Sequence, residues 1–229
     1  MRIETFLAAE LAPALATQVA EDLIAALDRR GRDAPPVSLA VPGGTTPVFF
    51  LKALGRVDLD WRRVCVTLTD ERWVPEDHPR SNQRLLCETL LAGDAGSARL
   101  VPLHRPGQEP EAALPGLAED LRPLLPLDIV VLGMGEDMHT ASLFPDADGL
   151  KASMAPEAAP VAVMRPEGQE ARVTLTAPVI TGAGQVYLLI KGAAKRAALE
   201  RALALDDPLR APVSLLSRTA REAVVFYAD

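Results

Sequence analysis

The sequence predicts an α/β fold: a mostly parallel, doubly wound sheet with helices on both faces. Short apolar runs typical of buried strands alternate with stretches of helical periodicity along all 229 residues. In addition, 48% of the residues are hydrophobic, which is enough for a large core. Because the chain has no internal repeat and no low-complexity linker, we expect residues 1–229 to form a single domain.

The first half of the chain alternates helical patterns with two buried strands. The first helix carries apolar residues every three or four positions and stops before Gly31. Ser81 or Asn82 is a candidate cap for a later helix, and Pro115 and Gly116 interrupt another. The expected elements are a helix at 7–30, a strand at 37–41, a helix at 48–54, a strand at 64–68, and helices at 81–91 and 109–121.

The second half of the chain is richer in strands. Its apolar runs are short, and one of them leads directly into a helix. The stretch at 151–160 is rich in Ala, Pro and Glu, and we expect it to be a flexible loop. The expected elements are strands at 127–132, 161–164, 172–175, 185–190 and 222–227, and a helix at 193–204.

Charge and composition exclude several classes of protein. The net charge of −7 argues against nucleic acid as a partner, because phosphate backbones require a basic surface. No apolar run approaches the roughly 20 residues of a membrane span. The N-terminus lacks the pattern of a signal peptide, so we expect a cytoplasmic protein. We also expect no obligate protein partner. Cys65 and Cys87 lie in apolar segments, which favours buried free thiols over a disulfide.

The first polar motif, Pro-Gly-Gly-Thr-Thr-Pro at residues 42–47, joins a strand to a helix. Gly43 and Gly44 let the backbone approach a ligand closely, and exposed amides at a helix start favour a phosphate. The hydroxyls of Thr45 and Thr46 can add hydrogen bonds. On this motif alone, an ordinary tight turn with a threonine cap remains an equal alternative.

The second motif, Asp70-Glu71-Arg72, follows a buried strand. Arg72 could clamp a carboxylate, a lactone oxygen or a phosphate, and Asp70 could orient a sugar hydroxyl or a neighbouring side chain. The alternative is a solvated loop with an internal ion pair. Trp73 and the nearby prolines favour a structured loop over a floppy one.

The third motif, at residues 133–145, follows another buried strand and reads as the start of a short helix. Imidazole titrates near ~6.5, so neutral His139 can take a proton from water at physiological pH. A carboxylate, either Asp137 or Asp70, could fix its tautomer and stabilise the imidazolium. The alternative is a capped helix start with a hydrogen-bonded, non-catalytic histidine.

Two cations and the placement of the motifs complete the candidate site. Arg172 begins one predicted strand and Lys191 ends another; either is ordinarily a solvated charge, but a phosphate at the glycine-rich turn needs cationic partners. The polar motifs follow the carboxyl ends of strands, so we expect them to converge on one crevice. Scattered His and Cys residues predict no metal and no cofactor, and no GxSxG elbow supplies a serine nucleophile.

Together these motifs resemble the 6-phosphogluconolactonase family over most of the chain. The family's glycine-rich loop matches residues 42–47, and its R-x-TLT element matches 172–176. Its DER-x-VP-x-x-H-x-x-SN block matches 70–82, and its GMG-x-D-G-HTASLFP block matches 133–145. The last two blocks are long and specific, so chance is a poor explanation for both.

The resemblance implies a Rossmann-like fold shared with glucosamine-6-phosphate deaminases and ribose-5-phosphate isomerases. It also implies hydrolysis of 6-phospho-D-glucono-1,5-lactone in the oxidative pentose phosphate pathway. His139 matches the family's catalytic histidine, and Arg72, Arg172 and Lys191 match its substrate-binding cations.

Two residues depart from the family pattern. Met138 replaces a glycine, which strains the backbone if its φ is positive. Pro42 stands where a serine is common, which removes a backbone donor and a hydroxyl from the loop. Neither departure removes a candidate catalytic group.

The expected mechanism begins with the phosphate on the Gly43–Thr45 amides, held by Arg172 and Lys191. His139 then deprotonates a water that attacks the lactone carbonyl, and Arg72 or a nearby amide stabilises the oxyanion. One alternative is a sugar-phosphate isomerase or deaminase on the same scaffold, although related deaminases carry a glutamate where this chain has Phe144. Another is a non-catalytic sugar-phosphate sensor, although the chain has no helix-turn-helix or basic patch.

Overall fold

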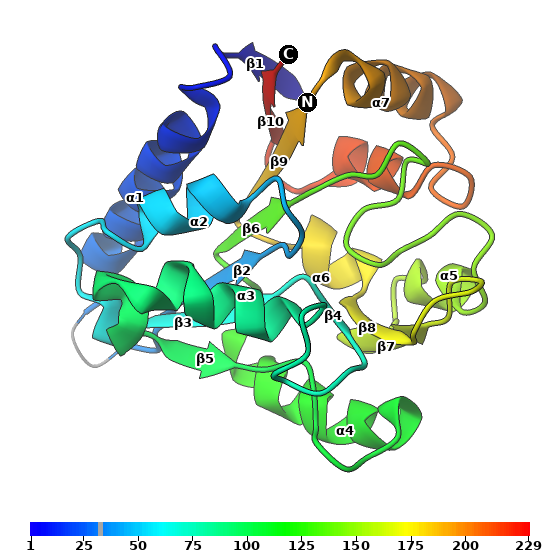
Figure 1. The fold of residues 1–229 in the computed structure, drawn as a ribbon, viewed down its shortest axis with the longest axis horizontal. Coiled ribbons are helices and arrows are strands. Elements are labelled where there is room, and N and C mark those ends of the chain that lie inside the picture. The colour runs from blue at the N-terminus through cyan, green and yellow to red at the C-terminus, as the bar shows by residue number, and fades with distance from the viewer. Residues whose placement is uncertain (32–33) are drawn as a thin grey trace.

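The computed structural model describes residues 1–31 and 34–229. Its largest element is a seven-stranded sheet in which all neighbouring strands run parallel (Figure 1). From edge to edge the strands are β1 (Arg2–Thr5), β10 (Val224–Ala228), β9 (Gln185–Lys191), β6 (Ile129–Leu132), β2 (Val37–Val41), β3 (Val64–Leu68) and β5 (Arg99–Val101).

Helices cover both sides of this sheet, which confirms the predicted doubly wound α/β fold. The α-helices are α1 (Leu11–Arg29), α2 (Val48–Leu54), α3 (Asn82–Glu88), α4 (Pro110–Leu121), α5 (Leu150–Ser153), α6 (Ala177–Thr181) and α7 (Ala193–Leu205). Short 3-10 helices occupy Trp61–Arg63, Leu90–Ala92, Asp94–Ser97, Arg122–Leu124 and Pro212–Arg218. Helices α1 and α2 lie on one side of the sheet, and α6 and α7 lie on the other (Figure 1).

The strand order reverses between β2 and β6. From β2 the chain continues to β3 and β5 at one edge, whereas from β6 it continues to β9 and β10 toward the other edge. Segments that leave two neighbouring strands in opposite directions open a crevice at the carboxyl ends of those strands. Residues 42–47 follow β2 and residues 133–145 follow β6, so two of the predicted motifs flank this crevice.

A second, three-stranded sheet was not predicted. It is antiparallel and consists of β4 (Asp70–Arg72), β8 (Arg172–Leu175) and β7 (Val161–Met164). Only Thr69 separates β3 from β4; its amide donates to Val41 of the large sheet, and its carbonyl accepts from Leu175 of the small one. The chain therefore passes directly from one sheet into the other beside the crevice.

Most predicted elements form, and the differences lie mainly at their ends. The first helix begins at Leu11 instead of residue 7, because Leu7 closes a separate exposed turn onto Glu10. Helix α4 runs through Pro115 without a break, since its buried apolar face outweighs the one hydrogen bond that the proline removes. The helix expected at 81–91 ends at Glu88, with a 3-10 turn after it, and Ser81 caps it as one of the two expected candidates.

Three further expectations need correction. Residues 133–145 form turns and isolated bridges instead of a short helix. Part of the loop expected at 151–160 is helical, because α5 extends to Ser153. Both cysteines are free as expected, but Cys87 is exposed on α3, whereas Cys65 is buried in β3. In the described ranges, no helix has the length and apolar character needed to cross a membrane.

Candidate active site

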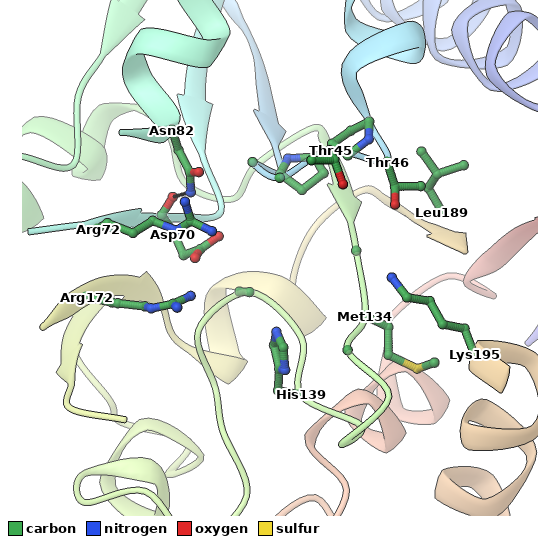
Figure 2. A pocket seen from close by; sticks show the side chains of 17 residues that line it. Thr45, Thr46, Asp70, Arg72, Asn82, Met134, His139, Arg172, Leu189 and Lys195 are labelled. Carbon is green, nitrogen blue, oxygen red and sulfur yellow. Dashed lines mark hydrogen bonds between the residues drawn. The ribbon is translucent and has the colours of Figure 1, made fainter. Parts of the chain in front are cut away.

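A pocket of about 240 Å³ opens where the strand order reverses. Figure 2 shows Arg72, Arg172, Asp70 and Asn82 on one side of it, Thr45, Thr46 and Lys195 on the other, and His139 pointing inward between them. Eight of the residues predicted from the sequence line this pocket: Gly43, Gly44, Thr45, Thr46, Asp70, Arg72, His139 and Arg172.

The glycine-rich turn after β2 needs both of its glycines. Gly44 has a φ of +91°, a conformation that residues with a side chain rarely adopt. A Cβ atom at Gly43 would lie only 1.9 Å from Oδ1 of Asn82. Asn82 in turn donates from Nδ2 to the carbonyl of Asp70 at 2.8 Å. The turn therefore packs directly against the β4–α3 segment and forms one wall of the pocket.

His139 is paired with Asp137. The Nδ1 atom of His139 lies 2.5 Å from Oδ1 of Asp137, and the amide of His139 donates to the same oxygen at 3.3 Å. Burial raises the pKa of Asp137, but the hydrogen bonds and charge of His139 outweigh this effect and leave that pKa below its usual value. An Nδ1 held in this way directs Nε2 of the ring toward the pocket. A Cβ at Gly135 would lie 2.3 Å from both His139 Nδ1 and Asp137 Oδ1, so glycine leaves room for the pair.

Asp70 is held by a different partner. Its Oδ2 atom accepts a hydrogen bond of 2.6 Å from the Ser142 hydroxyl, and its side chain is buried. Of the two carboxylates considered for orienting the histidine, Asp137 is thus the one in contact with it. Asp70 instead faces the pocket beside the arginines, where it can accept a hydrogen bond from a ligand hydroxyl.

Arg72 and Arg172 lie side by side because they are direct partners in the β4–β8 register. Arg72 donates to the carbonyl of Arg80 at 2.7 Å, and Arg172 donates to the side chain of Gln169. The Nε atoms of both arginines are buried and have no partner among the described residues. Burial lowers the pKa of Arg172, with Asp70 acting in the opposite direction. Both arginine side chains line the pocket, and a guanidinium can bind a carboxylate, phosphate or carbonyl oxygen there.

Glu71 fixes the wall that carries Arg72. Its carboxylate accepts hydrogen bonds of 2.7 Å from the amides of Arg72, Asn82 and Gln83, and it also accepts from the Ser81 hydroxyl. This side chain is almost fully buried, and burial raises its pKa against the effect of the three amides. The sequence predicts no role for Glu71 beyond its place in the Asp70-Glu71-Arg72 motif, because that role depends on a helix start about ten residues later.

The lysine in the pocket is Lys195. Lys191 ends β9, is exposed and is not among the lining residues, whereas Lys195 in the first turn of α7 is half-buried and lines the pocket. Gly192, with a φ of +95°, turns the chain from the strand into the helix and brings the later lysine back toward the crevice. The sequence signal for this lysine is its place in the first turn of a predicted helix that follows a strand and a glycine.

Comparison with known proteins places the chain in a family. The family model described as glucosamine-6-phosphate isomerases/6-phosphogluconolactonase matches residues 8–226. A 6-phosphogluconolactonase of Pseudomonas aeruginosa is 42% identical over 92% of this chain and 88% of its own length. The chain belongs to the 6-phosphogluconolactonase family. The resemblance inferred from the sequence motifs is thereby confirmed.

Solved structures agree with this membership in the 6-phosphogluconolactonase family. The crystal structure of a 6-phosphogluconolactonase from Shewanella baltica has a TM-score of 0.94 and 33% identity, covering 100% of this chain and 98% of that one. A monomeric glucosamine-6-phosphate deaminase has a TM-score of 0.82 at 18% identity, covering 100% of this chain and 97% of that one. The second likeness shows a common fold alone.

The departure at Met138 has a structural consequence in this lactonase-family site. Met138 has a φ of +70°, so a side chain stands in the left-handed conformation that a glycine adopts without strain. Hydrogen bonds hold the strained residue: its amide donates to Gly135, and its carbonyl accepts from Val213. The strain lies immediately before His139, and the surrounding bonds determine how that ring is presented. Pro42, the other departure, lines the pocket.

Proposed function

We propose that this chain hydrolyses 6-phospho-D-glucono-1,5-lactone to 6-phospho-D-gluconate, with His139 as the general base. The observation that carries the proposal is the His139–Asp137 pair at a pocket that has cationic side chains on both sides. A phosphorylated lactone offers two oxygen-rich ends, and this pocket offers a matching group to each.

The phosphate is assigned to the side formed by the glycine-rich turn and Lys195. Gly44 brings backbone amides close to the pocket, Thr45 and Thr46 add hydroxyls, and the ammonium of Lys195 supplies the charge (Figure 2). Lys195 takes the place expected for Lys191, and Arg172 is assigned to the opposite side.

The ester end is assigned to the arginine side. Nε2 of His139 accepts a proton from water, and the hydroxide attacks the lactone carbonyl carbon. The guanidinium groups of Arg72 and Arg172, which line the pocket, stabilise the resulting oxyanion. The ring C–O bond then breaks, and the leaving alkoxide takes the proton back from His139. Base catalysis of this kind contributes about 10²–10⁴-fold, and one oxyanion donor about 10²–10³-fold.

The alternative activity on this scaffold is deamination or isomerisation of a sugar phosphate. The side chain against the His139 ring is that of Phe144, which has no carboxyl group to assist a histidine in opening a sugar ring. This contact favours the lactonase. Ammonia release from glucosamine 6-phosphate would identify the alternative directly.

The test is a rapid acidification assay on freshly made 6-phosphogluconolactone, with and without a chelator. The wild-type protein should release protons far faster than spontaneous hydrolysis does, and EDTA should not change that rate. His139→Asn should lose about 10²-fold or more in kcat. Lys195→Ala should raise KM about tenfold or more with a smaller change in kcat, whereas the matched variant Lys191→Ala should resemble wild type. Near-native turnover by His139→Asn would exclude the general-base role.

A further inference from the structure

Phe144 contacts both the candidate base and a candidate binding cation. Its ring centroid lies 4.3 Å from that of His139, with the ring planes tilted by 33°. The Cζ atom of Arg172 lies over the same ring, 5.0 Å from its centroid. Phe144 is only 9% exposed, and it is not among the residues that line the pocket. One buried apolar side chain outside the pocket therefore packs against both His139 and Arg172.

A tight reversal of the chain brings Phe144 to this position. The amide of Gly135 donates to the carbonyl of His139 at 3.1 Å, and the amide of Leu143 donates to that of Thr140 at 2.9 Å. Thr140 also bridges to both Met134 and Leu143. These bonds fold residues 133–145 back on themselves, so that the ring of Phe144 meets the ring of His139.

The hydrogen bond to Asp137 does not by itself fix the imidazole. It holds Nδ1 of His139 but leaves the ring free to rock about that contact, whereas proton transfer requires Nε2 to face one water. Contact between the ring of His139 and the Phe144 ring restricts this motion, and tilted aromatic pairs are favourable.

Arg172 requires a neighbour that leaves its donors free. Its guanidinium is buried, and Nε has no partner among the described residues. The face of an aromatic ring attracts a cation without accepting its in-plane N–H groups. A carboxylate in this place would form an ion pair with Arg172 and compete with the substrate for those groups.

We propose that Phe144 is a positioning residue that holds His139 and Arg172 in a fixed relation, so that the base and the guanidinium act on the same ester. The roles of both partners rest on the proposed function. The contacts themselves do not, and this allows the two proposals to fail separately.

The decisive variant is Phe144→Leu, which keeps an apolar side chain but removes the ring. We expect kcat to fall by about 10- to 100-fold, as for a misplaced catalytic group, with a smaller rise in KM. Phe144→Tyr keeps the ring and should stay within about threefold of wild-type kcat. The matched control is Phe226→Leu, the same substitution at a buried ring in β10, outside the pocket. It should lower stability while kcat stays near that of wild type.

A second readout follows the His139 ring without any substrate. The chain has three histidines, so the His139 ring-proton NMR signals can be assigned by their loss in His139→Asn. These signals should carry a ring-current shift in wild type and Phe144→Tyr that disappears in Phe144→Leu. If Phe144→Leu does not fold, Phe144→Met, which fills similar volume, replaces it in both measurements.

The outcomes separate the two proposals. A folded Phe144→Leu or Phe144→Met variant with kcat and KM within twofold of wild type would overturn the positioning role. So would His139 signals that do not move. A wild-type protein that does not hydrolyse the lactone would instead overturn the proposed function, and the NMR shift would still decide whether Phe144 orders the histidine.

Discussion

The hydrogen bond between His139 and Asp137 can form only because residue 135 has no side chain, and a substitution at Gly135 tests this directly. Gly135→Ala would place a methyl group 2.3 Å from both paired atoms, so the two side chains must separate. Because flexible side chains can move aside, we expect little change in thermal stability but a fall of about 10²-fold in kcat. At Gly133, which also lines the pocket, nothing lies within 4 Å of an added Cβ, so Gly133→Ala leaves the His139–Asp137 pair in place and should lose less activity. Equal losses in both variants would contradict this explanation.

His104 predicts how stability depends on pH. Its ring packs on Trp73 at a centroid distance of 4.5 Å, and burial lowers its pKa, with Glu76 acting in the opposite direction. The unfolded chain, with an ordinary pKa near ~6.5, therefore takes up a proton at higher pH than the folded protein does. The contribution of neutral His104 to the unfolding free energy is fully present above the pKa of the unfolded chain and is lost as the pH falls below it.

The measurement is urea unfolding at pH 7.5 and 5.5, followed by tryptophan fluorescence. Wild type should lose more unfolding free energy between these pH values than His104→Phe, which has no group to protonate. Identical losses in the two proteins would show that His104 is not the group responsible.

At the scale of elements, Glu71 joins β4 to α3. Glu71→Ala would leave the buried amides of Asn82 and Gln83 without their acceptor, and we expect a loss of about 3 kcal/mol in unfolding free energy. Ser81→Ala removes one capping bond of the same helix and one long hydrogen bond to Glu71, and should cost only about 1 kcal/mol. Chemical unfolding of both variants measures the difference, and a Glu71→Ala protein no less stable than Ser81→Ala would contradict it.

Helices and strands could be predicted where their burial requires a run or a periodic pattern of apolar residues. Strands β2 and β3 are fully buried and mostly apolar, and their predicted bounds are those of the structure. Strands β4 and β5 have three residues each, too few for any periodicity to appear. Strands β7 and β8 of the small sheet form at their predicted bounds, but because β4 was not recognised, neither the second sheet nor the pairing of Arg72 with Arg172 was predicted.

The residues of the candidate site could likewise be predicted from local sequence patterns but not from contacts between distant segments. Residues within a motif, such as His139 and Gly43, were found because the motif fixes their neighbours along the chain. Lys195 was missed, because its position depends on the turn at Gly192 and on the direction of α7. Contacts across the fold, such as Phe144 on Arg172, leave no signal in one sequence.

At the scale of the whole molecule, the pocket lies where the large and small sheets meet. The glycine-rich turn follows the large sheet, whereas Arg72 and Arg172 belong to the small one. In the proposed binding mode, 6-phosphogluconate contacts both through its phosphate and its carboxylate. A ligand that bridges two units should stabilise them together, and binding at 100 times Kd should add about 2.7 kcal/mol to the unfolding free energy.

Hydrogen exchange with and without 6-phosphogluconate tests this bridging. We expect slower exchange both at residues 43–46 and at 172–175, since one ligand restrains the turn that follows a strand of the large sheet and a strand of the small sheet. At the same ligand concentration, Lys195→Ala should lose most of the protection at both places, because weaker phosphate binding empties the whole pocket, whereas Lys191→Ala should keep it. Protection confined to one of the two segments would mean that the ligand occupies only one side, and that the two sides do not bind a single molecule.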